Sequence, residues 1–294
     1  MKDRRCPRWL AGLLQRLLLL AAVLLAGGFA GALLVRVAPG FGADERMLDP
    51  RLSNYSIEAM GRERAAESNV LAYYANYLGR MAQGDLGESA SLGRPVAELL
   101  SERIGVSIRS VGAGLALAWA AVLISVFLLD LISQRPLDAV ASVFAGAALC
   151  VPAAVVALAC FHLGGTPGAA IACILGPRLF RYVRNLARRA RGAPHVLAAR
   201  AFGQTRLRIL ALHVLPPVLP EMSALAGVSG SMAVGTLIAV EALCDSPGVG
   251  QLVWQAALAR DLPVIVNVTL LITAVTAVAN CLADAGRTAR QVVS

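Results

Sequence analysis

The chain of 294 residues is 57% apolar and only 15% charged, with a mean hydropathy of +0.67. Soluble domains usually carry about a quarter charged residues, so the composition excludes an ordinary soluble protein and indicates a chain that lies in lipid. The net charge of +9 comes from arginines gathered beside apolar runs, which makes it a topology signal and not a nucleic-acid-binding surface.

Six apolar segments predict membrane crossings, each of which needs about 20 residues. Five charge-free runs reach that length, at 17–35, 111–129, 139–163, 222–240 and 262–283. Residues 167–177 make up about half a span and are followed by Arg178, Arg181 and Arg184. We predict a fourth crossing there, with its arginines at the cytoplasmic boundary and their charged ends in water. The predicted fold is an all-α polytopic membrane protein with six transmembrane helices.

The distribution of arginine predicts the orientation. Residues 178–208 contain nine arginines and no acid, whereas residues 39–110 contain ten acidic residues. We therefore predict a tail and first span at 1–38, an extracytoplasmic segment at 39–110, and a five-helix core at 111–294. The core includes a cytoplasmic loop at 188–220, and both termini are cytoplasmic. Within the outer segment, residues 68–81 predict a helix with an apolar face, laid on the membrane or on the helices below.

The residue types exclude two sources of energy. A P-loop needs a lysine against the phosphates, and the single lysine is Lys2. Proton relays use ionisable side chains inside spans, whereas Asp130, Glu221, Glu241 and Asp284 fall at predicted span ends. Transport by this chain would need energy from a partner. We expect no catalytic residue and no cofactor bound by the chain.

Two other kinds of membrane protein share this composition, an embedded enzyme and a scaffold. A membrane-embedded enzyme would need a nucleophile with a base, and the serines in the spans have no such setting. The six cysteines follow no paired spacing, and His162, His195 and His213 are isolated, so no metal site is predicted. A membrane scaffold without transport activity stays open, and co-purification with an ATPase would separate it from a permease.

Residues 194–220 predict a helix, a glycine turn and a second helix over 204–213. Pro194 suits a first helical turn, and Gly203 suits a left-handed cap. Small side chains beside Phe202 would let the first helix seat in a groove on another protein. On these features alone, a docking helix and a plain surface loop remain equal alternatives.

The spacing of two alanines, a glycine and a following Leu-Pro resembles the EAA loop of permeases in binding-protein-dependent importers. In that family the loop forms a coupling helix that fits a cleft on the ATPase. The glutamate that heads the general motif falls on Leu197, and peptide-type permeases often lack it. The resemblance implies these ATPase-coupling residues: Leu197, Ala198, Ala199, Arg200, Ala201, Phe202, Gly203, Leu215 and Pro216.

Further stretches extend the resemblance over nearly the whole chain. Residues 71–99 are similar to the outer segment of B-type peptide and nickel permeases, and residues 150–152 are similar to their proline-bearing helix, which Pro152 should kink. Residues 241–250 and 259–264 resemble the family's outer loop. On that resemblance the residues expected to face a binding protein are Glu241, Pro247, Gly248, Gly250, Arg260 and Asp261.

What the resemblance implies is a permease of the type I importer fold in the bacterial inner membrane. Its expected partners are a second permease, two ATPase subunits that use the ATP, and an extracytoplasmic substrate-binding protein. The substrate would be a dipeptide, an oligopeptide or nickel. Small residues of the fifth span either pack against other helices or line the path. The candidate path residues are Pro152, Ser223, Gly227, Gly230, Ser231 and Gly235.

Overall fold

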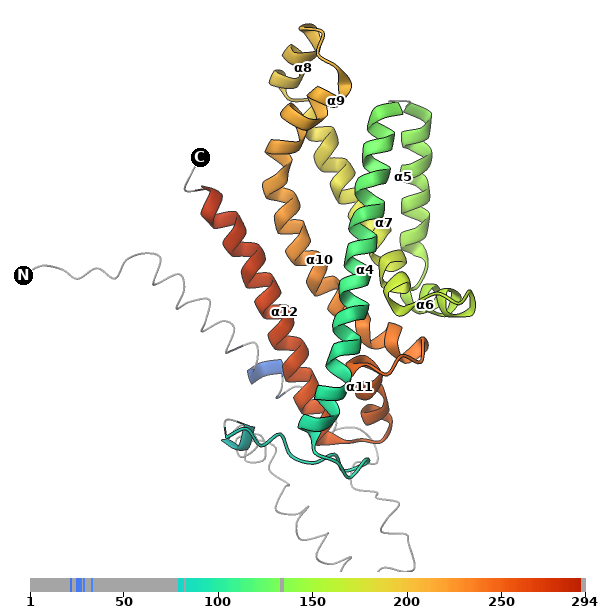
Figure 1. Cartoon of the computed structure of the whole chain (residues 1–294), viewed down its shortest axis with the longest axis vertical. Helices are drawn as coiled ribbons and strands as arrows, with labels where there is room; N and C mark the ends of the chain where they lie inside the picture. The colour runs from blue at the N-terminus through green and yellow to red at the C-terminus, as the bar shows by residue number, and fades with distance from the viewer. Residues whose placement is uncertain are drawn as a thin grey trace, which may run out of the picture. The chain divides into compact units, whose positions relative to one another are not determined.

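The computed structural model describes residues 79–132 and 135–291 apart from 82, together with positions 22, 25–27, 29 and 33 of the first predicted span. This part of the chain is α-helical, and its one β feature is an isolated bridge between Glu88 and Pro95. The all-α prediction is therefore confirmed. In chain order the helices are α4 (Val96–Ile132), α5 (Arg135–Cys150), α6 (Ala153–His162), α7 (Pro167–Arg191), α8 (Pro194–Ala201), α9 (Arg206–Ile209), the π-helix η2 (Leu210–Val214), α10 (Leu215–Leu243), α11 (Val249–Leu258) and α12 (Leu262–Gln291) (Figure 1).

Among the described residues, three helical stretches are long and apolar enough to cross a membrane: Val96–Ile132, Arg206–Leu243 and Leu262–Asn280. The bent pair α5 and α6 makes a fourth if it counts as one span. Most of the first predicted span, and of the helix predicted over 68–81, lies outside the described residues. The count of six crossings therefore stays a prediction.

The third predicted span is two helices and not one. A bend of 97° separates α5 from α6, and Pro152 lies in the break. Proline has no N–H to donate and its ring crowds the preceding turn, so a helix that meets it kinks or ends. The predicted kink at Pro152 is confirmed, and the single helix over 139–163 is corrected to a broken pair.

The fourth predicted span is longer than a half helix. Thr166 caps α7 by accepting a hydrogen bond from the Ala169 amide at 3.3 Å, and the helix then runs 25 residues through Pro177 to Arg191. The expectation that all three following arginines hold their charges in water is wrong for Arg184, whose side chain is buried with 4% of its surface exposed. Arg178 and Arg181, on the same helix, are exposed.

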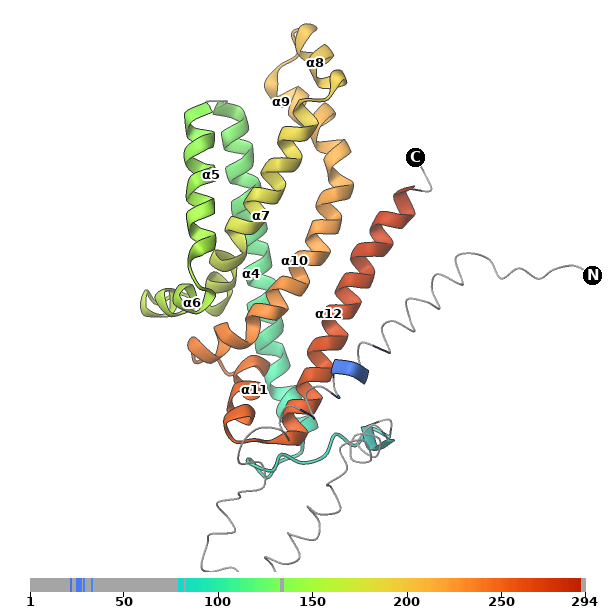
Figure 2. The ribbon, with the colours of Figure 1, turned by 180° about the vertical axis from the view of Figure 1, so that it is seen from behind.

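Residues 104–251 and 275–294 form one compact unit, whose core lies where α4, α7 and α10 meet (Figure 2). Glycine allows α4 to approach α7 closely, because a Cβ at Gly114 would lie 2.6 Å from Ile171 Cγ2 and 3.0 Å from the Gly168 carbonyl. Trp119 of α4 donates its indole N–H to the buried Ser229 hydroxyl of α10 at 3.0 Å. Apolar side chains, close contacts at glycines and this hydrogen bond thus join the three helices.

The described residues up to 103, together with 252–274, form the second unit. Val96 and Leu99, at the start of α4, are buried. Phe29 of the first predicted span and Met81 pack against Val266 of α12, as does Leu270. Met81 belongs to the predicted apolar face of 68–81, so at this residue the face packs on a helix. The other residues of that face lie outside the described part of the chain.

Candidate functional site

The predicted helix and glycine turn are both present at residues 194–204. Pro194 is in the first turn of α8, and Gly203 adopts a left-handed backbone with φ of +71°. The Gln204 amide donates to the Ala199 carbonyl at 3.2 Å, and the Gly203 amide donates to the Arg200 carbonyl at 2.9 Å. These two bonds make a Schellman cap, which requires the left-handed residue at this position.

The second predicted helix is not a separate element. Helix α9 begins at Arg206 and passes through the π-turn of η2 into α10 without leaving helical backbone, so residues 206–243 form one long helix. The predicted helix over 204–213 is therefore corrected to the first turns of the fifth span. Only the short turn at residues 202–205 therefore separates α8 from that span.

A proline after the π-turn leaves a carbonyl that α8 satisfies. Residue 217 is a proline with no N–H, so the His213 carbonyl lacks its usual partner four residues on. His195 of α8 supplies one, since its Nε2 donates to the His213 oxygen at 3.0 Å. The His213 ring in turn makes a 3.0 Å hydrogen bond to the Gln204 side chain. The two histidines, expected to be isolated, lie with ring centroids 6.3 Å apart and hold α8 against η2.

Helix α8 has an inner face and an outer face. Val196 and Ala199 are buried against Ile209 and Val214 in a small core of the loop itself. The sequence suggests that Ala199 is small in order to fit a groove on a partner. In the structure its small side chain instead allows close packing within the loop itself. The outer face exposes Leu197, Ala198 and Ala201 beside the charged Arg200, and Phe202, just after the helix, is 84% exposed. Leu215 and Pro216, at the start of α10, are exposed as well.

A cluster of charged side chains lies next to α8, and sequence reasoning missed it. Arg184 forms ion pairs with Asp130 near the end of α4 and with Asp138 of α5, the latter at 2.5 Å. Arg191 also pairs with Asp130, and Arg188 pairs with Asp138. Two features of the sequence could have indicated the cluster. One aspartate lies on each side of residues 133–134, and the arginines of α7 follow one another at the spacing of a single helix face.

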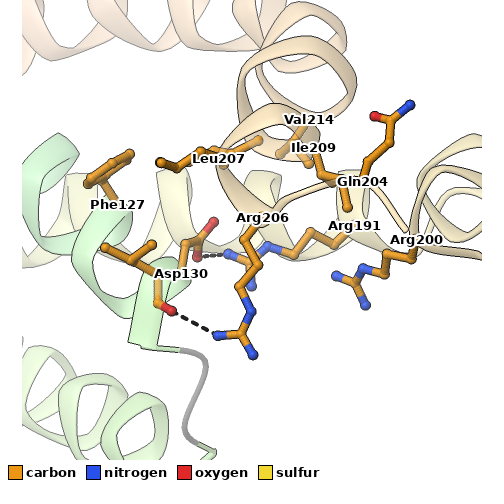
Figure 3. Close-up of a pocket in the computed structure, with 11 residues that line it drawn as sticks. Phe127, Asp130, Arg191, Arg200, Gln204, Arg206, Leu207, Ile209 and Val214 are labelled. Carbon is orange, nitrogen blue, oxygen red and sulfur yellow. Dashed lines mark hydrogen bonds and ion pairs between the residues drawn. The ribbon is translucent and has the colours of Figure 1, made fainter. Parts of the chain in front are cut away.

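Two members of the cluster, Asp130 and Arg191, line a cavity of about 270 Å³. Figure 3 shows that Asp130 of α4, Arg191 of α7, Arg200 of α8 and Arg206 of α9 all line it. Arg206 also donates to the Leu131 carbonyl at 2.9 Å, which caps an otherwise unpaired carbonyl at the end of α4. The cavity thus lies between the last turn of α4 and residues 194–214, which we call the α8 loop.

The predicted outer loop at 241–250 folds around Glu241, whose side chain is fully buried. One carboxylate oxygen accepts from the Ser107 hydroxyl at 3.0 Å and from the Gly250 amide at 2.7 Å. Gly248 is also buried against this carboxylate, while Pro247 is exposed. Glu241, Gly248 and Gly250 therefore shape the loop from inside and do not present side chains to a partner.

Asp261 is the matching buried acid of the second unit. It accepts from the Ser89 hydroxyl at 2.5 Å and from the Ser91 amide at 2.9 Å, just before α12 begins. Burial by itself would raise the pKa of the Asp261 carboxyl, but the hydrogen bonds from Ser89 and Ser91 outweigh it and hold that pKa below its usual value. Its neighbour Arg260 is exposed, so Asp261 holds the segment at 89–91 in place while Arg260 faces solvent.

The candidate path residues of α10 lie on one side of that helix. Ser223 and Gly235 are exposed, and Gly227, Gly230 and Ser231 are partly buried. Ser231 donates to the Asn280 side chain of α12 at 2.8 Å. A Cβ at Gly230 or Gly235 would meet nothing within 4 Å, so close packing inside this chain does not require a glycine at either position. Pro152 is exposed at the break between α5 and α6.

Comparison with known proteins reveals similarity over the same helices. Residues 121–289 match the family of the inner membrane component of binding-protein-dependent transport systems. The oligopeptide transport system permease protein AppB of Bacillus subtilis is 25% identical over 306 residues, covering 93% of this chain and 96% of that protein. The permease protein OppB of Salmonella typhimurium is 28% identical over 266 residues, covering 82% and 85%. OppB of Mycobacterium tuberculosis is 28% identical over 272 residues, covering 80% and 83%.

Proposed function

This chain belongs to the family of inner membrane components of binding-protein-dependent transport systems, and from this membership we propose that it is a permease subunit of an ATP-driven importer of peptides. The observation that carries the proposal is the family match over residues 121–289, which includes the α8 loop. Relatives that cover nearly the full chain are named oligopeptide permeases, which favours peptides over nickel as the substrate.

The partners follow from the same proposal. A second permease completes the path, two ATPase subunits bind on the cytoplasmic side, and a substrate-binding protein docks outside. The arginine-rich loop is cytoplasmic by the positive-inside rule, and so are both termini. The exposed apolar face of α8, with Leu197 and Phe202, is the ATPase-docking surface. Pro247 and Arg260 are the exposed candidates for contact with the binding protein.

Coupling follows from the continuity of the helix after α8. Closure of the ATPase subunits would move α8, and the bond between His195 and the His213 carbonyl would transmit that movement to η2 and α10. Since α10 carries the candidate path residues, a rigid-body movement there would open the path to one side or the other. The energy comes from ATP on the partner subunits.

The first test of this function is reconstitution in vesicles with the partner permease, the ATPases and the binding protein. Peptide uptake is expected only when ATP is supplied on the side that bears Arg200. The chain alone should neither hydrolyse ATP nor respond to a pH gradient. Cysteine crosslinking tests where the ATPase docks. A cysteine at the exposed Ala201 should crosslink to an ATPase subunit, and one at Trp254 of α11 should not. Uptake by the chain alone, driven by a pH gradient, would overturn the proposal.

A substitution in the α8 cap tests coupling separately. Gly203→Val forces a β-branched residue into a left-handed backbone and costs about 1 kcal/mol or more, although a Cβ there would meet nothing within 4 Å. The Schellman cap should open and peptide uptake should fall at least several-fold while the subunit still inserts.

Gly192→Ala is the matched control, because Gly192 ends α7 with an ordinary right-handed backbone. We expect normal uptake from this variant. Uptake and ATPase co-purification that are both unchanged in Gly203→Val would contradict the role of the cap.

A further inference from the structure

The cavity beside α8 carries more positive charge than its own acids neutralise. Across the cluster and the cavity wall there are five arginines and two aspartates, and Asp130 and Asp138 are each already paired with two arginines. The Arg200 guanidinium has no hydrogen bond or ion pair within the part of the chain that the structure describes. Arg206 uses one N–H on the Leu131 carbonyl, and its guanidinium keeps further donors. An anion in this cavity would find two arginines free to bind it.

An apolar stripe leads from the membrane-crossing part of α4 to this cavity. Ile124, Phe127, Leu128 and Leu131 follow one another at helical spacing on one face, and 41–59% of each is exposed. Phe127 and Leu131 belong to both the stripe and the cavity wall. Leu207 of α9, 56% exposed, extends the apolar rim on the other side.

We propose that this cavity binds the phosphate group of an anionic phospholipid, with an acyl chain along the α4 stripe and the phosphate between Arg200 and Arg206. Basic sites at the cytoplasmic ends of membrane helices attract anionic headgroups, and each arginine near the surface adds to that attraction. A lipid fits better than a soluble anion because the apolar stripe runs without a break into the arginine pair. The inference rests on the orientation proposed above.

A lipid bound here would act on the coupling loop. Its phosphate would bridge Arg200 of α8 and Arg206 of α9, and its acyl chain would lie on α4. The bound lipid would therefore stabilise one placement of the loop relative to α4, and transport would depend on the anionic lipid content of the membrane.

The test is direct lipid binding to the purified importer complex. The complex is equilibrated in detergent with dioleoyl phosphatidylglycerol or dioleoyl phosphatidylcholine, and retained lipids are counted by native mass spectrometry. The unmodified complex should retain phosphatidylglycerol in preference. The double variant Arg200→Gln with Arg206→Gln should bind it about tenfold more weakly or worse, since two headgroup contacts are lost.

Arg208→Gln is the matched control, because Arg208 is exposed on the same short helix and does not line the cavity. It should bind phosphatidylglycerol like the unmodified complex. Should the double variant fold poorly because Arg206 no longer caps α4, Arg200→Gln alone should still weaken binding several-fold with an unchanged melting temperature. Equal binding by all variants would overturn the proposal.

Two further measurements distinguish a bound lipid from the other anions that could occupy the cavity. Inorganic phosphate at millimolar concentration should not displace the lipid; displacement would identify a soluble-anion site and overturn the lipid assignment. Loss of the ATPase subunits from the double variant with lipid retention unchanged would mean that the arginines receive an acidic side chain of the ATPase. Lipid retention is measured without transport, so failure here is distinct from failure of the permease function.

Discussion

Arg184→Met is expected to lower the free energy of unfolding of this protein by about 3 kcal/mol, the low end of the cost of breaking a buried ion pair. The guanidinium is almost fully buried between Asp130 and Asp138, and methionine fills similar space without a charge. Both carboxylates would then lose their central partner and keep one arginine each, Arg191 for Asp130 and Arg188 for Asp138. The two acids would therefore be only partly compensated, which costs more than the net worth of the pairs. Thermal unfolding of the purified protein in lipid nanodiscs measures the loss.

Arg181→Met is the matched control, since Arg181 lies one turn earlier on α7 with its side chain exposed. We expect a change within about 0.5 kcal/mol. Arg184→Lys should lie between the two, because lysine keeps the charge but has no planar fork to reach two carboxylates. If Arg184→Met melts at the same temperature as Arg181→Met, the ion-pair cluster does not hold the ends of α4, α5 and α7 together.

Gly250→Ala should disrupt the loop that follows α10. A Cβ at this position would lie 2.8 Å from the Ile238 Cα and 2.8 Å from the Leu237 carbonyl oxygen, and backbone atoms inside a helix cannot move aside. Overpacking of this kind costs about 1–3 kcal/mol, and here it would also break the bond from the Gly250 amide to Glu241. Reduced melting temperature and faster proteolysis of the loop are the expected results.

A second glycine makes the test more specific. A Cβ at Gly248 would overlap the Glu241 carboxylate, which is a side chain and not backbone. Shortening that acid by Glu241→Asp should therefore relieve Gly248→Ala in part, while leaving Gly250→Ala as damaging as before, a coupling that a double-mutant cycle measures. Gly146→Ala on α5 serves as the control, because nothing lies within 4 Å of its added Cβ. Similar damage from all three alanines would contradict this packing argument.

The sequence alone determined those features that depend on neighbouring residues. Composition placed the chain in lipid, apolar runs located the helices, and local backbone chemistry located the left-handed turn at Gly203 and the break at Pro152. A proline or a glycine acts within one turn of itself, so no distant contact was needed. The motif at 194–216 likewise indicated the α8 loop and, by resemblance, the family of permeases.

Only the tertiary structure decided which polar side chains are inside. Arg184 was expected in water because three arginines follow an apolar run, but Asp130 lies 54 residues away and buries it. Glu241 was assigned to an outer surface, but Ser107, 134 residues away, holds it in the interior. Ala199 was expected to fit a groove on a partner, but Ile209 and Val214 cover it within the loop. The sequence around a charged or small residue is the same whether or not another segment of the chain covers it. Its burial is therefore decided by contacts between distant segments, which no spacing along the chain specifies.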